Sequence, residues 1–154
     1  MAKNDYRKTL DERGVTAFVA YGRSMWPTIK NGKHSVVIAK KAERLAPYDV
    51  ALFLRGNGAP VLHRVVEVLP DGYLMQGDGL TYTEKIDEDS VIGVLQGFYK
   101  GKRFIDASDE KHLKKVRRWY KSKVIRPIRL YFYNLKNRVV ARIKGVKKGE
   151  ENVD

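Results

Sequence analysis

The chain has 154 residues, of which 43% are hydrophobic and 32% are charged, the length and composition of one ordinary globular domain. It contains no cysteine, which excludes a disulfide framework, a thiol nucleophile and cysteine-based metal sites. The net charge of +13 is uneven: residues 1–98 carry 13 Lys and Arg against 12 Asp and Glu, whereas residues 99–154 carry 18 against 6. We therefore expect a nearly neutral body followed by a strongly basic extension.

The first part of the chain predicts a short helix followed by short strands. Residues 5–13 favour the helix. Runs rich in β-branched and aromatic residues then alternate with Gly, Pro and Asp turn residues. They are VTAFVAY (15–21), SVVIAKK (35–41), VALFLR (50–55), VLHRVVEVL (61–69), GYLMQGDG (72–79) and SVIGVLQGFYKG (90–101). Six or seven such strands at close spacing predict a mainly β fold, antiparallel and partly closed.

After residue 108 the apolar spacing becomes helical. A first helix is predicted within residues 109–123, and a second from about Pro127, a favoured first helical residue, to Ile143, with Gly145 as its stop. The second helix has an apolar stripe of Ile128, Tyr131, Phe132, Leu135, Val139 and Ile143, flanked by Arg129, Lys136, Arg138, Arg142 and Lys144. The chain thus divides into an N-terminal arm (1–14), a β domain (15–98) and a basic helical extension (99–154).

Four residues of the β part have side chains suited to nucleophilic catalysis. Ser24 lies in YGRSMWPTIKNG (21–32), between glycines and close to a proline, and His63 lies in the middle of a strand. Asp78 stands between two glycines, whose lack of a side chain permits close approach of other groups, and Glu84 follows six residues later. A serine becomes a nucleophile when a base takes its proton and a third group orients that base. These residue types alone do not establish that the four side chains meet.

Several of these residues also have purely structural interpretations. A turn serine, a strand histidine and an aspartate between glycines are common without catalysis. We expect Arg64 to pair with a carboxylate, His34 to lie in an exposed loop and His112 on a helix surface. Met25 and Trp26 are interpreted as apolar walls beside Ser24, where a substrate strand would lie. Strand alternation places Leu62, Arg64 and Val66 on one face and His63, Val65 and Glu67 on the other.

Three segments of the chain resemble the conserved boxes of the type I signal peptidase superfamily, in the same order. GRSMWPTIKNG is similar to its nucleophile box, and YDVALFLR followed by VLHRVVEVLPDG to its second region. YLMQGDG followed by SVIGVL is similar to its acidic box and closing strand. The resemblance covers residues 15–98 and implies a signal-peptidase/LexA-like antiparallel β body.

The resemblance also implies roles for individual residues. Leader peptidases and LexA-type repressors carry a lysine base at the position of His63, whereas the endoplasmic-reticulum and archaeal branch carries histidine there. The implied site has Ser24 as nucleophile and His63 as general base, with Asp78 or Glu84 orienting the histidine; which of the two does so stays open. The chain departs from the family pattern at Lys33, Tyr48 and Glu84, which stand in place of aspartate, glycine and aspartate.

The sequence therefore predicts a soluble serine endopeptidase that cleaves a peptide or protein precursor by acyl transfer and needs no metal or cofactor. The alternative is a non-catalytic peptide-binding or regulatory module on the same fold. The first residues contain no apolar signal-peptide core, and we expect a cytoplasmic location, at most peripheral at the inner face of the membrane. For the basic extension, packing on the β body together with contact to an anionic membrane surface is favoured, and nucleic acid is the less favoured partner.

Overall fold

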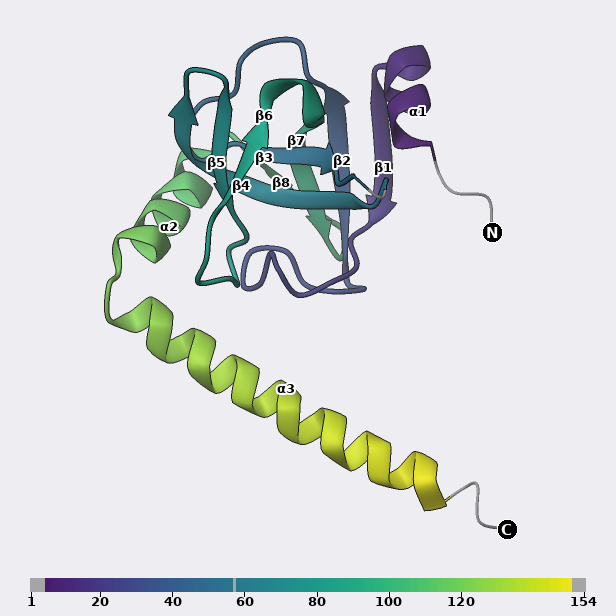
Figure 1. Cartoon of the computed structure of the whole chain (residues 1–154), viewed down its shortest axis with the longest axis vertical. Helices are drawn as coiled ribbons and strands as arrows, with labels where there is room; N and C mark the ends of the chain where they lie inside the picture. Colours follow the sequence, from purple (N-terminus) through teal and green to yellow (C-terminus); the bar gives the residue numbers. More distant parts are fainter. Residues whose placement is uncertain (1–4, 57, 151–154) are drawn as a thin grey trace. The chain divides into compact units, whose positions relative to one another are not determined.

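The computed structural model describes the backbone of residues 5–56 and 58–150, with side chains up to Ile143. It divides into two compact units, Met1–Arg117 and Arg118–Asp154. Figure 1 shows the elements, which in chain order are α1 (Tyr6–Arg13), β1 (Val15–Val19), β2 (His34–Lys40), β3 (Val50–Leu54), β4 (Pro60–Leu69), β5 (Gly72–Gln76), β6 (Glu84–Asp87), the single 3₁₀ turn η1 (Glu88–Ser90), β7 (Val91–Lys100), β8 (Arg103–Asp106), α2 (Glu110–Lys121) and α3 (Ile125–Glu150).

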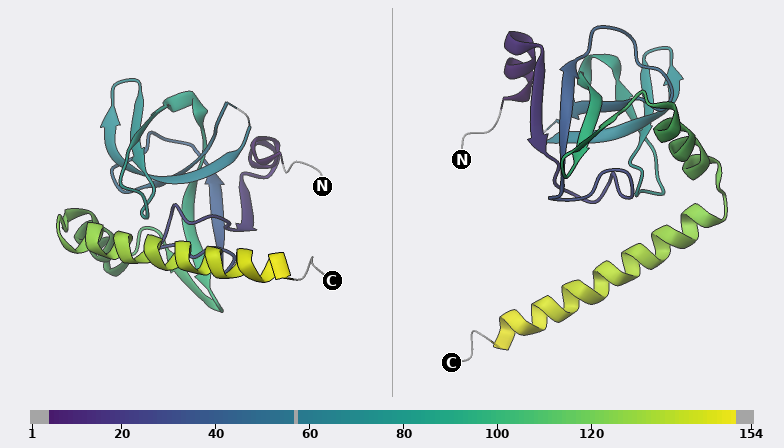
Figure 2. Two further views of the ribbon diagram at one scale, coloured as in Figure 1. Left: turned by 60° about the horizontal axis from the view of Figure 1, so that its bottom comes forward. Right: turned by 180° about the vertical axis from the view of Figure 1, so that it is seen from behind.

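The first unit is built on one antiparallel sheet with the strand order β1-β2-β7-β3-β4-β5-β6, and β8 pairs with β7. This confirms the prediction of a mainly β fold with helices at the C-terminal end. Helix α1 lies beside β1 in every view (Figure 1 and Figure 2). It begins at Asp5, whose carboxylate accepts a hydrogen bond from the Lys8 N–H (3.0 Å), and it ends before Gly14, as predicted.

Strand β3 is buried on both of its faces. Val50 and Leu52 belong to one apolar core, with Met25, Ile29 and Phe98 among its members. Ala51 and Phe53 belong to a second core on the other face, with Val65, Tyr73 and Met75 among its members. Because successive side chains of a strand point to opposite faces, a strand between two cores needs the unbroken apolar run VALFL. Each of these cores supports a different part of the candidate site.

Three local features differ from the sequence prediction. Strands β6 and β8 were not predicted, and strand pairing continues to Asp106, whereas the helical extension was expected to start at residue 99. A bulge in β4 pairs Val65 with Met75 and Glu67 with Leu74, and since these partners are adjacent, Val65 and Glu67 lie on opposite faces. The prediction that these two residues share a face was therefore wrong.

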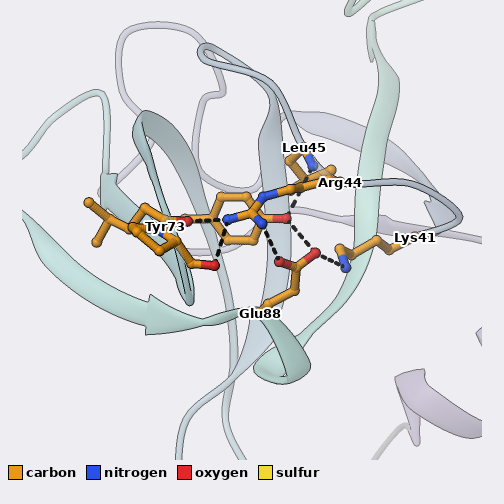
Figure 3. Close-up of polar contacts among 7 residues, drawn as sticks. Lys41, Arg44, Leu45, Tyr73 and Glu88 are labelled. Atoms are coloured by element: carbon orange, nitrogen blue, oxygen red, sulfur yellow. Dashed lines mark hydrogen bonds and ion pairs between the residues drawn. The ribbon is translucent and has the colours of Figure 1, made fainter.

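A partly buried polar network ties β5 to the segment between β2 and β3 and to η1 (Figure 3). The hydroxyl of Tyr73, fully buried, donates to Glu88 (3.0 Å) and accepts from the Leu45 N–H (3.1 Å). Glu88 also binds Lys41 (2.9 Å), while the Arg44 guanidinium donates to the carbonyl oxygens of Leu69 and Pro70. Burial raises the pKa of Tyr73, so the phenol remains a donor. The network holds the residues that follow β6, the strand that carries Glu84.

The second unit contains the end of α2 and the whole of α3. The Ser122 hydroxyl accepts a hydrogen bond from the Ile125 N–H (3.0 Å) and so caps α3. The Arg126 guanidinium lies 4.6 Å from the ring centre of Tyr120. Helix α3 begins before Pro127 and continues past Gly145 to Glu150. The predicted stop at Gly145 was wrong, because a glycine inside a helix costs only about 1 kcal/mol and does not by itself end it.

Candidate active site

Ser24 lies in a tight loop between β1 and β2. The Trp26 N–H donates to the Arg23 carbonyl (3.1 Å) and the Ile29 N–H to the Met25 carbonyl (2.9 Å). The Asn31 side chain accepts from the Gly22 N–H (2.9 Å) and closes the loop. Met25 is buried in the first core, which fixes the position of the residue before it. Ser24 itself is half-buried.

An apolar cleft of about 270 Å³ opens beside Ser24. Its walls come from the end of β1, the Ser24 loop, the start of β4 and α1; the lining residues used below are Phe18, Val19, Ser24, Met25, Leu52 and Leu62. Leu62 is the neighbour of His63 in β4. Met25 forms part of the cleft wall. Trp26 is half-buried and lies outside the lining.

His63 is only 2% exposed, and its Nδ1 atom lies 2.5 Å from Glu84 Oε1. The contact is short but poorly aligned, because Nδ1 has no partner with hydrogen-bond geometry among the described residues. Phe53 packs edge-on against the imidazole, with 5.8 Å between ring centres. Burial lowers the pKa of His63, and the Glu84 carboxylate opposes this effect in part. The imidazole is therefore neutral at pH 7 and able to accept a proton.

Asp78 contacts Arg64 instead of His63. The Arg64 Nε and Nη2 atoms each donate to one carboxylate oxygen of Asp78 at 2.8 Å, and both side chains are almost fully buried. The third direction of the guanidinium donates to the Tyr48 carbonyl (2.8 Å). The prediction that Arg64 pairs with a carboxylate is confirmed. A bidentate pair of this kind is geometrically specific, and breaking it leaves a buried charge.

The loop that carries Asp78 lies directly against the Ser24 loop. The Gly79 N–H donates to the Ser24 carbonyl (2.7 Å). A Cβ atom on Gly77 would come within 2.5 Å of that carbonyl oxygen, and one on Gly79 within 2.8 Å of the Arg23 carbonyl oxygen. Glycine is thus required on both sides of Asp78 by close approach, as the sequence pattern suggested.

The structure thus brings His63 to Glu84 and joins the Asp78 loop to the Ser24 backbone. Within the described residues no hydrogen bond joins the Ser24 hydroxyl to His63. In free enzymes, catalytic hydrogen bonds are often long and tighten only when substrate binds. The geometry therefore places the buried imidazole of His63 in contact with a carboxylate, while Ser24 lines a cleft whose lining includes Leu62, the neighbour of His63.

The two remaining histidines are less exposed than expected. His34 is the first residue of β2 and is 4% exposed; its ring stacks on Phe98, and its Nδ1 accepts from the Lys30 N–H (3.3 Å). His112 is half-buried against the edge of Phe98. The exposed position predicted for His34 was wrong, whereas His112 lies on helix α2, as predicted, and is half-buried because Phe98 offers an apolar surface to both rings.

Arg55 is a site residue that the sequence analysis missed. Its guanidinium lies 3.3 Å from Glu84 Oε2, so Glu84 is shared between His63 and Arg55. The two residues are 29 positions apart, and no local motif connects them. Leu62 and Phe18 line the cleft and were also missed by the sequence analysis. Because side chains alternate along a strand, Leu62 points to the face of β4 opposite His63, and this alternation could have identified it.

Comparison with models of protein families finds no match to this chain, and comparison with curated proteins finds no significant match. In the described residues no three His, Asp or Glu side chains group as metal ligands. Among the described helices, none combines the length and apolar character needed to cross a lipid bilayer.

Proposed function

We propose that the chain is a serine endopeptidase of the signal-peptidase type, which cleaves a peptide or protein precursor. The observation that carries the proposal is the contact of buried His63 with Glu84, which pairs a candidate base with a candidate orienting carboxylate. In the reaction, Ser24 Oγ attacks the scissile carbonyl, and His63 takes the hydroxyl proton at Nε2 and returns it to the leaving amine. Water then attacks the acyl group on Ser24. His63 takes a proton from this water and returns it to Ser24 Oγ, which releases the acyl group as a carboxylic acid.

Glu84 is the proposed orienting carboxylate. Its position at Nδ1 favours the tautomer that carries the proton there and leaves Nε2 free to act on the serine. Asp78 is proposed as a positioning residue, because its carboxylate is used by Arg64 and its loop supports the Ser24 carbonyl. The Ser24 backbone N–H is the candidate donor for the oxyanion, an interaction whose removal costs about 3–4 kcal/mol in other peptidases.

The substrate is proposed to bind as an extended strand along the cleft. Among the described strands, β1 pairs only with β2, and the first residues of β4 pair only with β3, since β5 pairs from Arg64 onward. Both free edges end at the cleft that Ser24 lines. Added-strand binding supplies backbone hydrogen bonds, and the apolar walls select a small apolar side chain. Precursors in the cytoplasm or at the inner face of the membrane, such as leader peptides of ribosomally made products, are the proposed substrates.

A non-catalytic peptide-binding module is the second candidate. It is favoured by one observation, the absence of a hydrogen bond between the Ser24 hydroxyl and His63 in the described part of the chain. In this case the cleft and the strand edges bind a peptide without cutting it. The two candidates differ in whether Ser24 becomes acylated.

The test combines a serine-reactive fluorophosphonate probe with digestion of a peptide library read by mass spectrometry. Wild type is compared with Ser24→Ala, His63→Ala and a matched control, Ser108→Ala, in which an exposed serine outside the cleft is removed. We expect labelling at Ser24 and a defined set of cleaved peptides, both lost in Ser24→Ala and His63→Ala and both retained in Ser108→Ala.

The outcomes separate the two candidates. Cleavage that disappears in Ser24→Ala supports the peptidase even if the probe reacts poorly. A folded wild type that neither labels nor cleaves, yet binds library peptides equally well with and without Ser24, overturns the peptidase and leaves the binding module.

A further inference from the structure

Helix α3 carries an apolar stripe that is open to solvent. Six aliphatic or aromatic side chains recur along it at spacings of three and four residues, and each is between 42% and 63% exposed; they are Ile125, Ile128, Phe132, Leu135, Val139 and Ile143. At 3.6 residues per turn they fall within an arc of about 80°. A continuous exposed stripe of this kind marks an interaction surface, since isolated apolar residues are common on surfaces but aligned ones are not.

Basic residues border this stripe on both sides. On the same helical projection, Lys136 and Arg129 follow one border, and Arg142 and Arg138 follow the other. Residues 111–149 contain fifteen Lys and Arg and no Asp or Glu. Tyr131, which is 64% exposed, lies at the border beside Arg142. An apolar stripe with cationic borders and an aromatic ring at the margin is the arrangement of helices that lie in a lipid–water interface.

The charge pattern disfavours two possible binding partners of the stripe, a second copy of α3 and nucleic acid. Two copies of α3 packed through this face would bring their basic borders together with no acidic partner between them. Nucleic acid would use the cations and the aromatic rings but would leave the aliphatic side chains in water, since phosphates and bases do not bury them. An anionic lipid surface uses both features, because acyl chains bury the stripe while Lys and Arg extend to the headgroups.

We propose that α3 binds the surface of a negatively charged membrane, with the stripe from Ile125 to Ile143 inserted below the headgroups and the basic borders in contact with anionic lipid. The helix lies along the surface and does not cross it. The proposal does not rest on the peptidase activity, because it uses no residue of the Ser24 cleft.

The test is flotation of the full chain with two kinds of vesicle, phosphatidylcholine alone and phosphatidylcholine with phosphatidylglycerol at about 3:1. Variants are Ile128→Ser with Leu135→Ser and Val139→Ser (stripe), Lys136→Gln with Arg142→Gln (border), and Asn134→Ser as a matched control on the opposite side of the helix. We expect binding to the anionic vesicles only. The stripe and border variants should each bind at least tenfold more weakly, and the control should bind as wild type does.

A second readout, the emission of Tyr131→Trp after subtraction of the wild-type emission from Trp26 and Trp119, reports insertion. We expect it to shift to shorter wavelength on addition of anionic vesicles and to stay unchanged with phosphatidylcholine alone. The proposal is overturned if the stripe variant binds like wild type, because binding would then be electrostatic only. It is equally overturned if single-stranded nucleic acid binds more tightly than the vesicles, or if the emission is already at short wavelength without lipid, as expected of a stripe packed on protein. Ser24 labelling is measured in the same variants, so that failure of either proposal is seen separately.

Discussion

Tyr48 occupies a backbone conformation that suits glycine. Its φ is +79°, and it is the only residue other than glycine with a positive φ in the described part of the chain. The conformation directs its carbonyl to Arg64 (2.8 Å), and its ring lies 5.9 Å below the Arg117 guanidinium. The Tyr48 carbonyl is the part of this residue that contacts Arg64 in the candidate site. The contact of its ring with Arg117 offsets part of the cost of the positive φ.

We therefore expect Tyr48→Gly to be more stable than Tyr48→Ala. Both variants lose the ring, but only glycine relieves the left-handed backbone, which costs other residues about 1–2 kcal/mol. The free energy of unfolding in urea should be higher for Tyr48→Gly by about 1 kcal/mol. Elsewhere alanine is usually the more stable of the two residues, so the opposite order at position 48 would contradict this account of the backbone.

Glu84 has two cationic or titratable neighbours, His63 and Arg55. Its carboxylate raises the pKa of His63 against the larger effect of burial, which lowers it. Removing the charge leaves only the smaller effect of Asp78 to oppose burial, so the pKa of His63 falls further in Glu84→Gln. The glutamine also gives a weaker acceptor for the Nδ1 proton that the proposed mechanism requires.

For Glu84→Gln we expect two changes in the rate of probe labelling at Ser24 measured against pH. The maximal rate should fall by at least about tenfold. The acid limb of the profile, where His63 becomes protonated, should move to lower pH. A matched Glu110→Gln change in α2, away from the cleft, should alter neither. An acid limb that moves to higher pH in Glu84→Gln would show that this carboxylate does not act on His63.

At the scale of the elements, the Ser24 loop and the Asp78 loop pack directly against each other. Their contact combines the hydrogen bond from Gly79 to Ser24 with the absence of a Cβ at residues 77 and 79. The buried pair of Arg64 and Asp78 connects this unit to β4. The Ser24 loop therefore depends on two segments more than 30 residues further along the chain, β4 and the Asp78 loop.

A methyl group at position 77 tests this dependence. We expect Gly77→Ala to lower the free energy of unfolding by about 1–3 kcal/mol, the usual effect of overpacking, and to slow labelling of Ser24 in the fraction that stays folded. Gly56→Ala is the control, since its Cβ would meet nothing within 4 Å, and it should change stability by less than about 0.5 kcal/mol. Equal behaviour of the two variants would show that the loops are not in close contact.

At the scale of the whole molecule, all three histidines are held in surroundings that disfavour their charged form. Burial is the largest cause of the lowered pKa for each of them. Lys30 and Lys100 lower the pKa of His34 further, while Asp78 opposes the lowering in His63 and His112. The unfolded chain, in which histidine titrates near pH 6.5, therefore binds protons that the folded chain does not.

We accordingly expect stability to decrease with acidity in a defined window. The histidine contribution is complete above about pH 7 and is lost as the pH falls through about 6.5, because protons then favour the unfolded chain. The lowered pKa values of Asp11, Asp71, Glu88 and Asp106 act in a separate window near pH 4 and below. Thermal unfolding followed by circular dichroism should show Tm falling between pH 7 and pH 5.5.

The variant His34→Leu tests whether histidine causes this fall in Tm. In His34→Leu the Tm should be lower overall, since the Lys30 N–H loses its acceptor, but its decrease between pH 7 and pH 5.5 should be shallower. A Tm that does not change in this window, or an unchanged slope in the variant, would contradict the assignment.

The sequence by itself determined those features that depend on neighbours in the chain. The alternation and turn residues of 15–101 predicted the mainly β class, the 3.6-residue spacing after residue 108 predicted the helices, and charge counting separated the basic extension. It also identified Ser24, His63, Asp78 and Glu84 as candidate site residues, through residue type and the family resemblance. Strands β6 and β8 escaped prediction, because TEKIDE and RFID are short and charged and are held by pairing with β5 and β7.

Only the tertiary structure decided how the candidates meet. The pairing of Met75 with Glu84 brings that carboxylate, and not Asp78, to His63, while Asp78 is used by Arg64. The burial of His34 and the contact of Arg55 with Glu84 were likewise beyond the sequence. Such contacts are set by strand register, and a slip of one residue would turn every side chain to the other face. Register is fixed when the strands pair in the assembled sheet, through contacts between residues that are far apart in the chain.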